Sequence, residues 1–128
     1  MKLYNKKNKI EYIIYTAVIL GGIFIDWLTK FLAVKLLMPL GESVPIISGV
    51  LQLTYVENTG AAFGMLKNHR WVFIAVSTLA IIGIGLFLYL GHAPSRLGAI
   101  ALSMIVSGGI GNMIDRICLG YVVDFIDF

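Results

Sequence analysis

Three long apolar runs, separated by polar and turn-rich segments, dominate the pattern along the chain. The first covers residues 12–34 and carries Asp26 within it. The second covers residues 71–90, which hold no charge and at 1.5 Å per residue cross a hydrocarbon core of roughly 30 Å. The third covers residues 97–114. The pattern predicts three transmembrane helices in a single membrane domain, residues 1–128.

The basic N-terminus followed by an apolar run also fits a secretory signal peptide. However, no small-x-small cleavage motif follows the run, and its apolar character continues past Asp26. We therefore interpret residues 12–34 as a retained helix.

The segment between the first two runs, about residues 36–70, mixes polar and apolar residues. Residues 51–55 (LQLTY) alternate cleanly, which is typical of a strand, and the preceding stretch is punctuated by Pro39, Gly41, Pro45 and Gly49. We expect a small sheet or hairpin at the membrane surface. The GHAPSR segment, residues 91–96, predicts a tight turn between the second and third helices.

Composition agrees with a membrane protein. Hydrophobic residues make up 59% of the 128 residues and charged residues 13%, and the mean hydropathy is +0.89. A soluble domain of this size cannot bury so much apolar surface. The net charge of +3 does not indicate nucleic acid, because four of the ten basic residues precede the first apolar run, as they do beside a membrane.

The same lysine cluster predicts the orientation. With the N-terminus inside, equal numbers of basic residues fall on the two sides, so their count does not discriminate. Charges beside the first span weigh most, which favours a cytoplasmic N-terminus. The end of the first helix, the insert and the end of the third helix then meet at the outer face.

Ionisable and amide side chains lie within or at the ends of these apolar segments, where they are costly and commonly functional. They are Asp26, Lys30, Asn58, Asn112, Asp115, Arg116 and Asp124. Each also has a purely structural interpretation: Asp26 and Lys30, four apart, can pair on one helix face for roughly 0.5 kcal/mol if exposed. Asn112 and Arg116 can cap or snorkel. Because these residues converge at one depth, we favour a functional interpretation over a purely structural one.

Other chemistries fit less well. Gly108, Gly109 and Gly111 lack the preceding strand of a dinucleotide-binding loop, and His69 and His92 fall on opposite sides of the membrane. The single cysteine, Cys118, is interpreted as a small residue near a helix end. A transporter ranks last, since internal repeats and mid-span acids are missing. We expect no metal and no cofactor.

Three motif blocks resemble, in order and spacing, those of bacterial lipoprotein signal peptidase (signal peptidase II). They are DWLTK (residues 26–30), ENTGAAFG (57–64) and GGIGNMIDRICLGYVVDFIDF (108–128). The resemblance covers essentially the whole chain.

The resemblance implies an aspartic protease in the bacterial inner membrane, with its N-terminus cytoplasmic and its active site at the extracytoplasmic face. The family's fold is an all-α polytopic membrane protein of four transmembrane helices with a small extracytoplasmic β-cradle. Its substrates are prolipoproteins, cut just before a cysteine that carries a diacylglyceryl group, so the implied partners are this substrate and membrane lipids.

The resemblance also implies residue roles. Asp124, in GYVVDF, matches one of the family's two catalytic aspartates. Asn112 and Arg116 match polar residues that line the substrate site, with Asp115 beside them. The remaining motif positions, which shape or support the site, are matched by Asp26, Lys30, Asn58 and Gly60.

The chain departs from the family at one point. The second catalytic aspartate belongs to a Phe-Asn-x-Ala-Asp motif at the start of a fourth span, and residues 1–128 contain neither. Asp127 is only three residues after Asp124 and is not expected to replace it. From this pattern we expect a chain truncated relative to the family and catalytically inactive as written. The alternative is a non-catalytic membrane protein that binds lipoprotein signal peptides.

Overall fold

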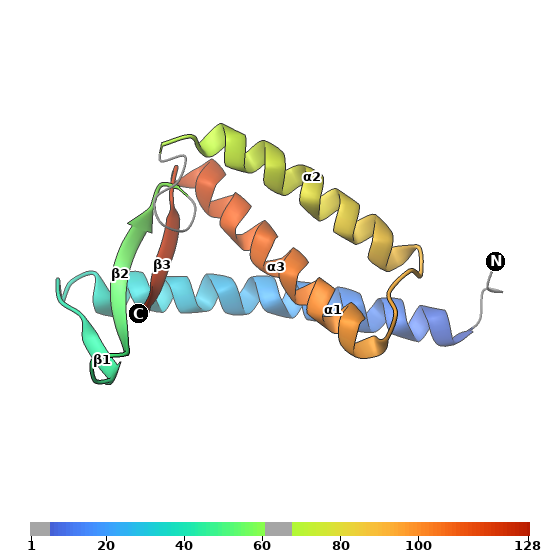
Figure 1. The fold of residues 1–128 in the computed structure, drawn as a ribbon, viewed down its shortest axis with the longest axis horizontal. Coiled ribbons are helices and arrows are strands. Elements are labelled where there is room, and N and C mark those ends of the chain that lie inside the picture. The colour runs from blue at the N-terminus through green and yellow to red at the C-terminus, as the bar shows by residue number, and fades with distance from the viewer. Residues whose placement is uncertain (1–5, 61–67) are drawn as a thin grey trace.

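The computed structural model describes residues 6–60 and 68–128. Three long helices form most of it: α1 (Lys6–Leu32), α2 (Arg70–Tyr89) and α3 (Arg96–Cys118) (Figure 1). Each of the three is long and apolar enough to cross a membrane. We call the end of the molecule where α1 and α3 finish and α2 begins the site end.

Helix α3 packs against both α1 and α2. Small residues allow the close approach to α1. A Cβ atom at Gly22 of α1 would lie 2.7 Å from the Cβ of Ser107, and Ala99 and Ser103 of α3 are fully buried. Bulky apolar side chains point outward instead; Leu79 of α2 is 72% exposed. This inside-out distribution suits a lipid surrounding, where small residues make the helix contacts.

The end opposite to the site end is closed by contacts among the three helices. Tyr15 of α1 is buried with Leu88 of α2 and Ala99 of α3. Arg96 at the start of α3 forms an ion pair with Glu11 of α1. These contacts hold the far ends of the helices together, and sequence analysis did not anticipate them.

A three-stranded antiparallel sheet stands at the site end (Figure 1). Its strands are β1 (Val44–Ile47), β2 (Leu51–Asn58) and β3 (Val122–Asp127), in the order β1-β2-β3. Pro45 lies in β1, an edge strand, where a missing N–H donor is tolerated. The β1–β2 turn contains Gly49 at φ +76°, a conformation that favours glycine.

The sheet is anchored to α1 through a wider helical turn, η1 (Ala33–Leu37), that continues α1. Ala33 and Leu37 of this turn are buried together with Val123 of β3. The predicted fold class, a helical membrane protein with three apolar helices and a small sheet, is confirmed.

The third helix and the segment after it determine where Asp124 lies. Helix α3 continues to Cys118, and the chain then turns through Gly120, at φ +86°, into β3. Sequence analysis did not predict β3, although two valines, a phenylalanine and an isoleucine within six residues favour a strand. The turn sends β3 back along β2, where Asp124 lies opposite Val56.

Candidate functional site

Lys30 is the centre of the polar contacts between α1 and α3. Its Nζ lies 2.9 Å from Asp26 Oδ2, one turn earlier on α1, and 2.9 Å from Asp115 Oδ2 on α3. It also donates a hydrogen bond of 3.0 Å to Asn112 Oδ1. An ammonium group has three N–H donors, so these three acceptors saturate it.

This Lys30 cluster (Asp26, Lys30, Asn112, Asp115) is largely removed from solvent. The side chain of Lys30 is 10% exposed, and those of Asp26 and Asp115 are 23% and 15% exposed. Two carboxylates around one ammonium leave the cluster with one negative charge. Desolvated charges are tolerated only when they are paired with good geometry, and here every contact to Lys30 is 3.0 Å or shorter.

Gly111 makes this approach of α3 to α1 possible. A Cβ atom built at Gly111 would lie 2.6 Å from Cγ of Asp26 and still closer to its Oδ2. No side chain fits there unless the carboxylate moves. The glycine therefore places the backbone of α3 directly against the carboxylate of Asp26.

Asp115 connects the Lys30 cluster to the sheet. The same oxygen, Oδ2, that contacts Lys30 accepts a hydrogen bond of 3.1 Å from the backbone N–H of Val123. Val123 is 3% exposed and immediately precedes Asp124. Asp115 thus fixes the backbone of β3 beside the residue that matches a catalytic aspartate.

The side chain of Asp124 is held from β2. Asn58 Nδ2 donates a hydrogen bond of 3.0 Å to Asp124 Oδ2, and Asn58 Oδ1 accepts one of 3.0 Å from the backbone N–H of Gly60. The backbone donor fixes the amide orientation, because its oxygen must face Gly60 and its NH₂ group must face the carboxylate. The antiparallel pairing of β2 with β3 brings these residues together.

Arg116 approaches the same side of the site from α3. Its guanidinium lies 4.7 Å from the ring centroid of Phe73 on α2, and its Nη2 donates a long hydrogen bond of 3.5 Å to the carbonyl of Gly60. Its positive charge interacts favourably with Asp124 and Asp115.

The structure places all eight residues singled out in the sequence at the site end. They form the Lys30 cluster and a second group, the Asp124 group, which consists of Asn58, Gly60, Arg116 and Asp124. The Asp115–Val123 hydrogen bond joins the two. Residues 61–64 of the ENTGAAFG motif lie outside the described residues.

Sequence analysis missed two contributors, Phe73 and the backbone N–H of Val123. Phe73 is one of many apolar residues in α2, and a backbone donor has no sequence signal.

Asp127 has different partners from Asp124. It accepts hydrogen bonds of 2.7 Å from Gln52 Nε2 and 3.1 Å from Thr54 Oγ1. Within residues 6–60 and 68–128, no group of three or more His, Cys, Asp or Glu side chains is placed to hold a metal ion.

The environment of one tyrosine of the sheet raises its pKa. Burial raises the pKa of the Tyr55 phenol, and hydrogen bonds with Tyr121 and Glu57 raise it further. The phenol, which is protonated at neutral pH even at its ordinary pKa of about 10, donates a hydrogen bond of 3.1 Å to Glu57 Oε1.

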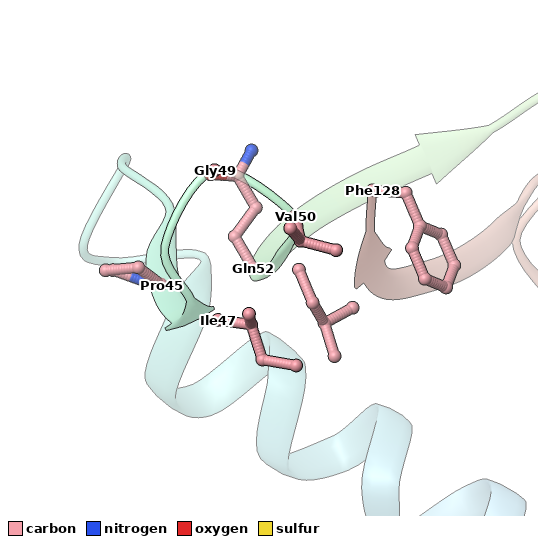
Figure 2. Close-up of a pocket in the computed structure, with 7 residues that line it drawn as sticks. Pro45, Ile47, Gly49, Val50, Gln52 and Phe128 are labelled. Atoms are coloured by element: carbon pink, nitrogen blue, oxygen red, sulfur yellow. The ribbon is translucent and has the colours of Figure 1, made fainter.

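A shallow hollow of about 200 Å³ lies away from these charges, at the β1–β2 hairpin. Figure 2 shows that Ile47, Val50 and Phe128 turn their apolar side chains toward it. Its lining includes none of the eight site residues. Those eight residues lie instead at the junction of α1, α3 and the sheet.

Comparisons with known proteins show which family the chain is similar to. A family model described as "Signal peptidase (SPase) II" matches residues 5–128. A protein of Caldanaerobacter subterraneus subsp. tengcongensis named lipoprotein signal peptidase is 51% identical over 107 residues, which are 83% of this chain and 72% of that protein. One of Brevibacillus brevis with the same name is 48% identical over 118 residues, 91% of this chain and 76% of the relative.

The fold is also similar to a solved structure. A bacterial membrane enzyme determined by the in meso method at 2.3 Å resolution superposes with a TM-score of 0.77 at 28% identity. The superposition covers 89% of this chain and 69% of the solved one.

Proposed function

This chain belongs to the signal peptidase II family, a family of bacterial membrane proteases that cleave lipoprotein signal peptides, and we propose that its Asp124 supplies one of two catalytic carboxylates. The implied substrate is a prolipoprotein with a lipid-modified cysteine. The observation that carries the proposal is the support of Asp124, whose side chain is held by Asn58 while Asp115 holds the adjacent backbone.

Peptide hydrolysis by an aspartic protease requires two carboxylates. One, ionised, takes a proton from the attacking water, and the other, protonated, donates to the amide that is cleaved. Two neighbouring carboxyl groups share one proton because both cannot ionise cheaply. Proton transfer of this kind contributes roughly 10²–10⁴-fold to the rate.

We further propose that the 128-residue polypeptide lacks this second carboxylate. In the described part of the chain, Asp26 and Asp115 contact Lys30, and Asp127 is held by Gln52 and Thr54. Glu57 of β2 accepts a hydrogen bond from the Tyr55 hydroxyl, and the side chain of Asp124 is held by Asn58. On this proposal, catalysis requires a second carboxylate that residues 1–128 do not supply.

A cleavage assay tests this proposal. The 128-residue polypeptide and its Asp124→Asn variant are purified in detergent and incubated with a diacylglyceryl-modified prolipoprotein, and the released signal peptide is quantified by mass spectrometry. We expect equal signals at the level of the enzyme-free control. Cleavage by the parent that Asp124→Asn abolishes would show that these residues contain a complete catalytic pair.

The alternative function is binding of lipoprotein signal peptides without turnover. The Lys30 cluster favours this binding function. The contacts of Lys30 with Asp26, Asp115 and Asn112 form within residues 1–128 and do not require a second catalytic carboxylate. A fluorescently labelled lipidated signal peptide that binds saturably to both polypeptides, with no cleavage, supports this alternative. Absence of saturable binding excludes it.

We also propose that the N-terminus is cytoplasmic and that the site end faces outward across the inner membrane. The lysines before the first apolar run, at positions 2, 6, 7 and 9, support this orientation. In a Cys118→Ser background, a cysteine placed at exposed Glu42 should react with a membrane-impermeant maleimide in osmotically permeabilised cells whose inner membrane is intact. A cysteine placed at Lys9 should stay unlabelled until that membrane is lysed. The reverse pattern would invert the orientation.

A further inference from the structure

The outward face of α1 carries a column of aromatic rings that ends at a lysine. The ring centroids of Phe24 and Trp27 are 6.0 Å apart, and those of Trp27 and Phe31 are 5.5 Å apart with the rings nearly parallel at 18°. The ammonium of Lys35 lies 5.4 Å from the centroid of Phe31. We call these four residues the aromatic column.

The aromatic column lies on a face of α1 that is turned away from α3. Asp26 and Lys30 face α3. Around a helix with 3.6 residues per turn, Phe24 and Phe31 are displaced from both of them by about 100° or more, and Trp27 is displaced by about 100° from Asp26 and about 60° from Lys30. Their side chains are 59%, 56% and 43% exposed. None of the described helices or strands covers this face.

Lys35 differs from most other described cations near the site end. Lys30 pairs with two carboxylates, and Arg116 interacts with Asp124 and Asp115. Lys35 is exposed and, among residues 6–60 and 68–128, forms no ion pair; its partner is the face of Phe31. An ammonium at the end of an apolar helix face, with its three N–H donors open, suits an external anion.

The length of the column matches one leaflet of a membrane. Eleven residues separate Phe24 from Lys35, which at 1.5 Å per residue is roughly 16 Å. Half of a hydrocarbon core is about 15 Å thick. When Lys35 lies at headgroup level, the three rings therefore extend over the depth of one set of acyl chains.

We propose that the aromatic column is a docking site for one anionic phospholipid of the leaflet at the site end. Its phosphate lies against the ammonium of Lys35, and an acyl chain lies along Phe31, Trp27 and Phe24. Lysines near a membrane surface attract anionic lipids, and aromatic rings at this depth offer a broad apolar surface.

A second copy of the chain is a poorer occupant of this face. In a membrane, a dimer with a two-fold axis along the membrane normal has parallel helices, which would bring the two Lys35 ammonium groups to the same depth at the interface. Helix pairs in membranes also use small residues at their contacts. The aromatic column instead presents large rings.

Tryptophan quenching tests the proposal, because the chain has two tryptophans, Trp27 and Trp71. A Trp71→Phe variant leaves Trp27 as the reporter. It is reconstituted into phosphatidylcholine vesicles in which a fixed fraction of the lipid carries brominated acyl chains, on either phosphatidylglycerol or phosphatidylcholine. From the quenching we expect a relative association constant roughly fivefold higher for phosphatidylglycerol, which corresponds to about 1 kcal/mol for one lysine near the surface.

Two charge variants in this background distinguish a specific lipid site at Lys35 from a general attraction of anionic lipids to the positively charged protein. Lys35→Gln should reduce the preference for phosphatidylglycerol to near one. Lys9→Gln, which removes the same charge at the opposite end of α1, should leave it unchanged. Three outcomes would overturn the proposal. The first is equal quenching by both lipids in the parent, and the second is an equal loss of the phosphatidylglycerol preference in the two variants. The third is no quenching by either lipid, which would show that protein covers Trp27.

Discussion

Replacing Lys30 with methionine is expected to lower the free energy of unfolding by roughly 3–5 kcal/mol, the usual cost of removing one partner from a buried ion pair. Methionine preserves most of the volume but leaves Asp26 and Asp115 as two largely buried carboxylates without their shared cation. It also removes the hydrogen bond to Asn112. Unfolding by increasing sodium dodecyl sulfate in mild detergent measures the change.

Removing one of these carboxylates as well distinguishes charge from packing. The double variant Lys30→Met with Asp26→Asn keeps the side-chain shape at position 26 and leaves one uncompensated charge instead of two. We therefore expect it to be more stable than Lys30→Met alone, with a favourable coupling energy in the double-mutant cycle. If the two losses simply add, the ion pair does not stabilise the junction of α1 and α3.

The second large effect is expected from Gly111→Ala, which places a methyl group where the carboxylate of Asp26 lies. The variant must separate α3 from α1 or displace Asp26 from Lys30. Overpacking of this kind costs roughly 1–3 kcal/mol, and we expect the upper end of that range because the displaced group is a largely buried charge. The same unfolding experiment reports it.

Gly108→Ala is the matched control, since it lies on the same helix and a Cβ atom there meets nothing within 4 Å. Alanine is favoured over glycine in a helix by about 1 kcal/mol, so this variant should be neutral or slightly stabilising. Equal destabilisation by the two substitutions would indicate that α3 needs glycine flexibility, and not the close contact with Asp26.

The gathering of these polar residues at one end of the molecule was predictable because a membrane restricts where polar groups occur. Asp26 and Lys30 are polar positions in an apolar helix, and their pairing follows from a spacing of four residues. The purely local interpretation of Arg116, as a snorkelling residue, did not anticipate its stacking on Phe73 of another helix. Nor did the local pattern indicate that Asn112 accepts a hydrogen bond from Lys30, 82 residues earlier in the chain.

The sequence by itself determined the three apolar helices, a strand at residues 51–55 that the structure extends to Asn58, and the set of polar side chains within the apolar segments. Hydrophobic period and length are local properties of the chain. Only the tertiary structure decided which partner each polar group has. Lys30 contacts Asp115 because α3 crosses α1 at the glycine of position 111. Asn58 contacts Asp124 because β3, after the turn at Gly120, pairs with β2 in one register. Contacts of about 3 Å depend on that crossing and that register, which are set by packing between segments far apart in the chain.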